Sequence, residues 1–212
     1  MSENKVDYAA KLNIDYPDRL LNRVTSFFRF FMVIPIAIIL GLLASHGFPG
    51  GKNSNIWLGG VAGGVGVLFL PTLLMILFRQ KYPRWWFDWN LAITRFGYRV
   101  ISYFSLFTDV YPSTDEEQSV HLDISYPDVK NDLKRWYPLV KWFLAIPHYI
   151  VLFFLGIASI VCIIFAWFAI LFTGRYPRGL FDFVLGVYRW GLRVSAYAFI
   201  LVTDKYPEFS MN

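Results

Sequence analysis

The sequence predicts an all-α integral membrane protein built from two similar halves. The chain is 56% hydrophobic and 17% charged, whereas soluble domains are roughly 45–50% apolar and about 25% charged. The apolar excess lies in long uninterrupted runs, which is typical of membrane proteins. The third observation is that the sequence of the first half returns in the second half.

Two blocks of the first half return in the second half. KLNIDYPDRL at 11–20 returns as HLDISYPDVK at 121–130, and KYPRWWFDWNLAITRFGYRVISY at 81–103 returns as RYPRGLFDFVLGVYRWGLRVSAY at 175–197. Both copies end in Thr-Asp-x-Tyr-Pro, at 108–112 and 203–207. A repeat of this length predicts a duplicated structural unit. We therefore define unit one as residues 1–115 and unit two as residues 116–212.

Each unit opens with a short alternating segment. Residues 12–16 and 122–126 alternate apolar and polar side chains, and each segment is followed by a proline, Pro17 or Pro127. Period-two alternation that stops at proline predicts a short strand or an extended arm. Because the arms are alike, they could pair with each other or pack on the facing unit.

The apolar runs predict four spans, at about 27–44, 56–78, 139–155 and 157–173. Each is long enough, or nearly so, for a hydrocarbon core of about 30 Å. The last two come from one run, Leu139 to Thr173, which would measure about 52 Å as a single helix. We therefore expect a hairpin that turns near Gly156 to Ser159; one strongly tilted span is the alternative.

Glycines are frequent in the first half of the 56–78 run. Gly59 with Gly63, and Gly60 with Gly64, have the small-xxx-small spacing that lets a second helix approach closely. The pattern fits packing against the first span of the same chain or a dimerisation face.

Basic residues flank the predicted spans and predict the topology. They precede the first and third spans and follow the second and fourth, whereas the loop at 45–55 holds only Lys52. The positive-inside rule then places both termini and residues 79–138 in the cytoplasm. The first 26 residues lack the apolar stretch of a cleavable signal peptide, so we expect the first span to direct insertion.

An amphipathic helix is predicted after each Tyr-Pro-Arg, at about 84–107 and 178–202. At 100° per residue its charged side chains share one narrow stripe on an otherwise apolar helix. Such a helix can lie in the cytoplasmic interface or span the bilayer with the stripe inward. A spanning helix would give each unit three spans and would invert unit two relative to unit one. Both units carry their basic residues in the same arrangement around the predicted spans, which favours placement in the interface. The stripe residues are Arg84, Asp88, Arg95 and Arg99 in unit one, and Arg178, Asp182, Arg189 and Arg193 in unit two.

The arginine stripes are the candidate binding site. Guanidinium groups match phosphate bidentately, so we expect the stripe to bind anionic lipid headgroups or a partner. The alternative is structural, since Arg84 with Asp88, and Arg178 with Asp182, have the i,i+4 spacing of helical ion pairs. The candidate binding residues are Arg84, Arg95, Arg99, Arg178, Arg189 and Arg193, and the candidate structural pairs include Asp88 and Asp182.

The sequence holds none of the common catalytic signatures. It lacks GxxxxGK[ST], GxSxG, HExxH and CxxC, and its single cysteine, Cys162, lies in an apolar run. We expect no catalytic residue, metal or cofactor. The duplicated Asp109 and Asp204 suggest a capping or turn role, and His148 in an apolar run suggests packing. The net charge of +5 clusters beside apolar runs, so we expect lipid rather than nucleic acid as its partner.

Taken together, the YPDR/YPDV, YPRWWFDWN/YPRGLFDFV, RFGYRV/RWGLRV and TDxYP motifs resemble a bacterial membrane family known as domain of unknown function 4389. Each half is similar to one copy of that domain, so the resemblance covers nearly the whole chain. It implies a multi-pass protein of the bacterial cytoplasmic membrane and implies no activity. The glycine-rich loop and longer second span of unit one depart from the pattern, which makes the two copies unequal.

These observations predict a non-enzymatic multi-pass membrane scaffold or an accessory subunit of a membrane complex. Its expected partners are anionic lipids and either another membrane protein or a second copy of the chain. The alternative is a transporter or lipid-translocating protein with a polar pathway between the two units.

Overall fold

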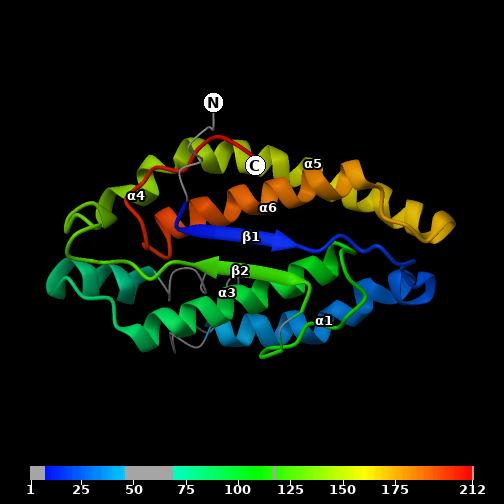
Figure 1. Cartoon of the computed structure of the whole chain (residues 1–212), viewed down its shortest axis with the longest axis horizontal. Coiled ribbons are helices and arrows are strands. Elements are labelled where there is room, and N and C mark those ends of the chain that lie inside the picture. The colour runs from blue at the N-terminus through cyan, green and yellow to red at the C-terminus, as the bar shows by residue number, and fades with distance from the viewer. Residues whose placement is uncertain (1–7, 46–68, 117, 212) are drawn as a thin grey trace, which may run out of the picture.

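The computed structural model describes residues 8–45, 69–116 and 118–211 and is mostly helical (Figure 1). A short apolar helix, Phe69–Arg79, precedes α3. The labelled elements are β1 (Ala10–Ile14), α1 (Arg23–Ser45), α3 (Arg84–Phe104), β2 (Val120–Ile124), α4 (Pro138–Leu144), α5 (Ile146–Thr173) and α6 (Arg178–Ala198).

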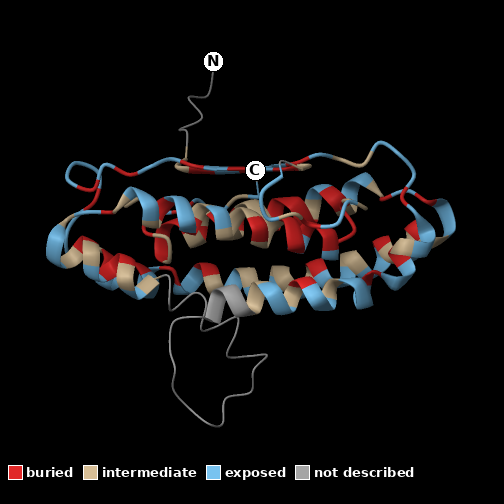
Figure 2. Cartoon of the chain, turned by 90° about the horizontal axis from the view of Figure 1, so that it is seen from below, coloured by how far each residue is buried: buried red, intermediate tan, exposed pale blue. Residues whose placement is uncertain are grey.

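The elements form three layers. Strands β1 and β2 pair as a two-stranded antiparallel sheet, called the ribbon below. The ribbon lies on α3 and α6, with β1 against α6 and β2 against α3, and these helices in turn pack on α1 and α5. Figure 2 shows the ribbon as a separate layer on one side of the helices, and Figure 1 shows the strands and helices following the same long axis.

The predicted arms therefore pair with each other across the two units. Leu12 lies opposite Leu122 in the register, and the ladder is extended by a hydrogen bond from the Asp15 amide to the Ser119 carbonyl (3.0 Å). Alternate residues of each strand are buried against the helices and exposed on the other side. The exposed side chains are polar: Lys11, Asn13, His121 and Asp123.

The expected hairpin within 139–173 is wrong, because α5 is continuous from Ile146 to Thr173. The expected spans at 139–155 and 157–173 are replaced by the short α4 and the long α5. The helix break falls before Pro147, where proline fits the first turn of a new helix. Near the expected turn, the Ser159 hydroxyl donates to the Leu155 carbonyl (2.8 Å), so its polar group is satisfied inside the helix.

Among the residues that the structure describes, two helices are long and apolar enough to cross a membrane, within Arg23–Gly41 of α1 and along Ile146–Thr173 of α5. Only 17% and 11% of their most apolar windows are buried inside the molecule, so these are surface helices rather than core helices. This exposure indicates membrane association. Helix α1 covers the predicted span at 27–44. Residues 56–68 of the predicted span at 56–78, which include its glycine pairs, lie outside the described residues, and the rest of that span falls in the helix Phe69–Arg79.

The amphipathic helices begin at Arg84 and Arg178, the residues at which the sequence places them, but they end earlier than the predicted 107 and 202. A leucine in left-handed conformation follows each helix: Leu106 (φ 66°) lies two residues after the end of α3, and Leu201 (φ 61°) lies three residues after the end of α6. Glycine usually occupies such a position. Both leucine side chains are buried in the core, and this burial offsets the conformational cost.

The ribbon register allows a direct test of the pairing between the arms of the two units. In a Cys162→Ala background, we expect the pair Lys11→Cys and Asp123→Cys to form a disulfide under mild oxidation, because these residues lie directly opposite each other. Cβ atoms at opposite positions are about 4.5–5.5 Å apart, close to the distance a disulfide needs. The matched control is the diagonal pair Asn13→Cys and Asp123→Cys. Non-reducing electrophoresis measures both, and faster cross-linking of the diagonal pair would contradict the register.

Candidate functional site

The arginine stripes face the ribbon. The Arg95 Nε donates to the Leu122 carbonyl (2.9 Å), and the Arg189 Nε donates to the Leu12 carbonyl (3.0 Å). The 15–119 pair is hydrogen-bonded, so alternation along the ladder makes Leu12 and Leu122 a pair whose carbonyls point away from the partner strand. The two guanidinium groups therefore supply hydrogen-bond donors to the carbonyls at the outer edges of the ribbon. Each arginine binds the arm of the other unit.

A second arginine of each stripe holds the segment that follows its own helix. The Arg99 Nη1 donates to the carbonyls of Ser113 (3.0 Å) and Thr114 (3.2 Å). The Arg193 guanidinium donates to the Ser210 carbonyl. Burial lowers the pKa of the Arg193 guanidinium, and the nearby Glu208 carboxylate opposes that shift. These contacts fold each tail back along its helix.

The first arginine of each stripe stacks on a tyrosine of the facing arm. The guanidinium carbon of Arg84 lies 4.8 Å from the centre of the Tyr126 ring, and that of Arg178 lies 4.4 Å from the centre of the Tyr16 ring. Such cation–π contacts contribute about 0.5–1 kcal/mol at exposed sites. Arg178 also lies 3.7 Å from an Asp18 carboxylate oxygen.

The predicted pairs of Arg84 with Asp88 and of Arg178 with Asp182 are wrong. Among the ion pairs of the described residues, neither is formed within 4.0 Å. Both aspartates are exposed, and an exposed ion pair is worth too little to hold a guanidinium in place. The tyrosine of the facing arm competes successfully for the arginine.

The same two tyrosines lock the arms onto the helix starts. The Tyr16 hydroxyl donates to the Tyr176 carbonyl, and the Tyr126 hydroxyl donates to the Tyr82 carbonyl. Burial raises the pKa of Tyr82 to about 12. The acceptor tyrosines belong to the Tyr-Pro-Arg motifs. The two repeated motifs, the arm and Tyr-Pro-Arg, therefore contact each other at two equivalent junctions.

Four of the six stripe arginines, Arg95, Arg99, Arg189 and Arg193, thus donate hydrogen bonds inside the molecule. The Arg178 side chain is 71% exposed and the Arg95 side chain 42% exposed, whereas Arg99 is buried. Lipid or partner binding by the six arginines stays a prediction, and their structural role in seating the ribbon and the tails is visible directly.

Two buried ion pairs were missed by the sequence predictions. The Lys141 Nζ lies 2.6 Å from an Asp204 carboxylate oxygen and donates to the Thr203 carbonyl (2.6 Å). Arg29 makes the corresponding contacts with Asp109 and the Thr108 carbonyl in unit one. Two features of the sequence could have indicated these pairs. Arg29 and Lys141 are the charged residues that interrupt the apolar runs, and Asp109 and Asp204 occupy equivalent positions in the two units.

The aspartates of these pairs also accept backbone hydrogen bonds, as the predicted capping role requires. Asp109 accepts from the Asn22 amide (2.8 Å), and Asp204 accepts from the Lys134 amide (2.7 Å). Burial lowers the pKa of the Lys141 ammonium, and the Asp204 carboxylate opposes that shift. Each aspartate therefore ties the end of the amphipathic helix to the segment that leads into the apolar helix.

His148 has a packing role in the structure. Its Nδ1 accepts a hydrogen bond from the Trp190 Nε1 (3.1 Å), and its ring stacks on Phe209 with centroids 3.9 Å apart. The contact fastens the C-terminal tail over α5 and α6.

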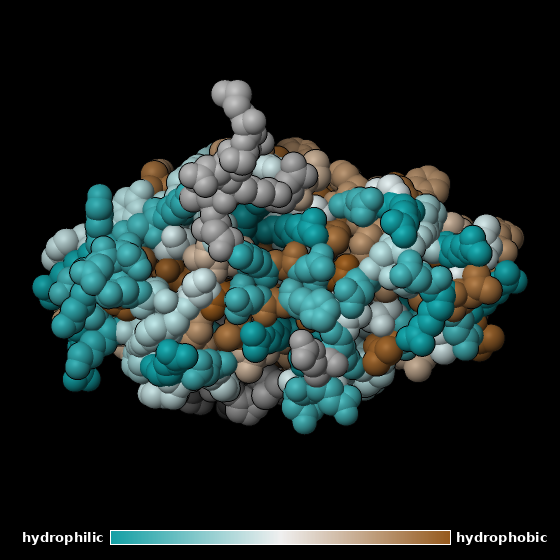
Figure 3. Space-filling model, in the orientation of Figure 1, coloured by the Kyte–Doolittle hydropathy of each residue, from teal (hydrophilic) through white to brown (hydrophobic). Residues whose placement is uncertain are grey.

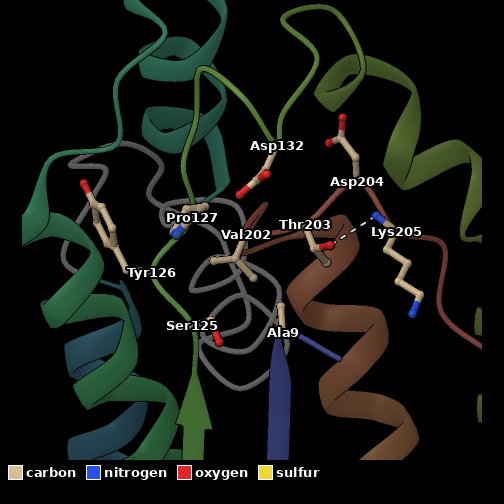
Figure 4. A pocket seen from close by; sticks show the side chains of 9 residues that line it. All are labelled: Ala9, Ser125, Tyr126, Pro127, Asp132, Val202, Thr203, Asp204 and Lys205. Atoms are coloured by element: carbon tan, nitrogen blue, oxygen red, sulfur yellow. Dashed lines mark hydrogen bonds between the residues drawn. The ribbon is translucent and has the colours of Figure 1, made fainter. Parts of the chain in front are cut away.

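Two hollows accompany the ribbon. One, called the ribbon groove, has a volume of about 680 Å³ and mixes basic residues (Lys11, Arg95, Arg99) with acidic ones (Asp115, Asp123). The other lies at the end of the ribbon, has a volume of about 300 Å³, and is lined by Asp132, Thr203, Asp204 and Lys205 among others (Figure 4).

Neither hollow offers a recognisable catalytic arrangement among the described residues. In the smaller one, Asp204 is already engaged by Lys141, and Figure 4 shows the Lys205 side chain extending away from Asp132 and Asp204. No group of three or more His, Cys, Asp and Glu side chains gathers as a metal site in the part of the chain that is described.

Comparison with known proteins agrees with the motifs of unit two. Residues 135–211 match the model of a family described as Domain of unknown function (DUF4389). The match spans α4, α5, α6 and the tail that carries Thr203 and Asp204, and it includes one copy of the domain. No curated protein and no solved structure matches the chain.

The buried pair in this matched region generates a stability prediction. Asp204→Asn leaves the Lys141 ammonium buried without its charge partner, which should lower the free energy of unfolding by about 3–5 kcal/mol. Adding Lys141→Met should restore at least half of that loss, because the lone buried charge is removed. Denaturation in detergent micelles measures both variants. The matched control is Asp18→Asn, which removes the partner of Arg178 in an exposed ion pair and should change the free energy of unfolding little. Equal losses of stability at Asp18 and Asp204 would contradict the assignment of Lys141–Asp204 as a stabilising buried pair.

Proposed function

We propose that the protein is a non-enzymatic scaffold held at a membrane, with an apolar side in lipid and a polar ribbon side available to partners. The observation that carries the proposal is the exposed apolar surface of α1, α4 and α5. Soluble monomers rarely expose contiguous apolar patches larger than a few hundred Å². The large exposed side chains of this surface include Phe27, Phe30, Phe31, Trp142, Phe143, Phe153, Phe154, Ile157, Phe165 and Phe172.

The side that carries the ribbon has the opposite character. Charged and polar residues spread across it in Figure 3, with apolar residues more frequent toward the margins. The exposed side of the ribbon carries Lys11 opposite Asp123 and Asn13 opposite His121. A surface of mixed charge supports recognition of another protein or of a second copy of the chain.

The proposal includes two tandem copies of the matched domain, residues 1–115 being a diverged first copy. Corresponding residues of the two units make corresponding contacts, for example Arg95 and Arg189 with the facing arms. Asp109 and Asp204 likewise make corresponding ion pairs. Such matched contacts are expected when one ancestral unit has been duplicated.

The transporter alternative needs a polar pathway between the units, and the described contacts there favour packing instead. Phe107 of unit one packs against Tyr176, Phe181 and Tyr188 of unit two, with ring centroids 5.5, 4.4 and 6.0 Å apart. An aromatic cluster of this kind excludes water and resists opening, as a structural core does.

Substitutions on the apolar side test the proposal. We expect Phe154→Asp combined with Phe165→Asp to release the protein from membranes during a high-salt wash, because aspartate costs about 2.5–3.5 kcal/mol at the centre of a membrane helix. Both side chains are more than 60% exposed. The control is Ser125→Asp, an exposed residue beside the ribbon, which should leave membrane retention unchanged. A wild-type protein that is monodisperse in buffer without detergent would contradict the proposal.

A further inference from the structure

Resting on the proposed membrane scaffold, we infer that α1 and α5 lie along the plane of one membrane leaflet and do not cross the bilayer. In this orientation the ribbon faces water, and the two ends of the long axis rest on anionic phospholipid headgroups of the same leaflet. Three observations support it: the direction of the ribbon, the positions of the basic residues and the length of α5.

The ribbon follows the same axis as the apolar helices (Figures 1 and 2). It lies on the middle of the amphipathic helices, because Arg95 and Arg189 bind its carbonyls from within α3 and α6. If α5 crossed the bilayer, the ribbon beside it would lie at acyl-chain depth. Its exposed Lys11 and Asp123 would then face hydrocarbon, at about 2.5–3.5 kcal/mol for each charge near the bilayer centre. In the plane of the leaflet, the same side chains face water.

The long axis ends in two basic clusters. At the first end, the Leu21 amide bonds the Gly174 carbonyl (2.9 Å) and the Arg23 Nη2 bonds the Phe172 carbonyl (3.2 Å), which joins the start of α1 to the end of α5. At the second end, the Arg135 Nε bonds the Leu77 carbonyl (2.7 Å), which joins the segment before α4 to the end of the helix Phe69–Arg79. The basic residues of the first end are Arg19, Arg23, Arg175 and Arg178, and those of the second are Arg79, Lys81, Arg84, Lys130, Lys134 and Arg135.

The length of α5 separates these clusters by more than the bilayer core. Its 28 residues measure about 42 Å at 1.5 Å per residue, against about 30 Å of hydrocarbon. A crossing α5 would place one basic cluster on each face of the membrane, contrary to the positive-inside rule. The in-plane orientation places both clusters on one leaflet, where anionic headgroups attract juxtamembrane basic residues.

Cysteine labelling distinguishes the two orientations. In a Cys162→Ala background, single cysteines replace Lys81 and Arg175, which precede Tyr-Pro-Arg in the two units and mark opposite ends of the long axis. A third variant, Asp123→Cys, reports on the ribbon, and Phe154→Cys reports on the apolar side. Each full-length protein is treated with a membrane-impermeant maleimide in right-side-out and in inside-out vesicles. Lys130→Cys replaces Lys81→Cys if the latter fails to give a stable protein in detergent.

The inference predicts that Lys81→Cys, Arg175→Cys and Asp123→Cys are labelled from the same, cytoplasmic side, while Phe154→Cys is labelled only after detergent is added. Labelling of the two ends from opposite sides, or protection of Asp123→Cys, would overturn the in-plane orientation and leave the membrane scaffold standing. Labelling of Phe154→Cys in intact vesicles would overturn both, because the apolar side would then lie in water.

Discussion

The structure depends on how the outer carbonyls of the ribbon are satisfied. Leu12 and Leu122 are buried at the centre of the ribbon, and their carbonyls point to its edges, where the described part of the chain supplies no further strand. An unpaired backbone carbonyl in an apolar setting costs about 1–3 kcal/mol. Arg189 and Arg95 fill these positions from the middle of the amphipathic helices. The charged stripe must therefore face the ribbon, which leaves the apolar sides of these helices to pack on α1 and α5.

This constraint turns the charged stripes toward the ribbon and leaves much of the apolar surface of the molecule outside. Arg99, the Arg29–Asp109 pair and the Lys141–Asp204 pair lie between elements. Helices α1 and α5 are left with exposed phenylalanine and isoleucine side chains. Such a distribution is stable in lipid, where apolar surface is solvated by acyl chains and buried polar groups need partners from the protein itself.

Local signals in the sequence predicted the elements that depend on local physics. Proline before Arg84 and Arg178 predicts where the amphipathic helices begin, and alternation at 12–16 and 122–126 predicts the strands. The break before Pro147 was missed because the length of the run at 139–173 favoured a turn at its middle, near Gly156 to Ser159, over one tilted span. The helix ends at Phe104 and Ala198 were missed because the chain turns away at Leu106 and Leu201, and leucine adopts a left-handed conformation only when the surrounding core compensates for it. For the site, the stripe was predictable from helical periodicity, but its partners were not, since Tyr126 and Leu122 reach Arg84 and Arg95 only through the tertiary fold.

Each unit is completed by the arm of the other unit, and producing the two units as separate fragments tests this dependence. Residues 1–115 and 116–212, carrying different affinity tags, would be produced separately and together in the same membranes. The account predicts that the fragments co-purify in equal amounts and that each alone is degraded or aggregates, because each lacks the strand that pairs with its own arm and binds its stripe. Recovery of either fragment as a stable, folded monomer would contradict the account.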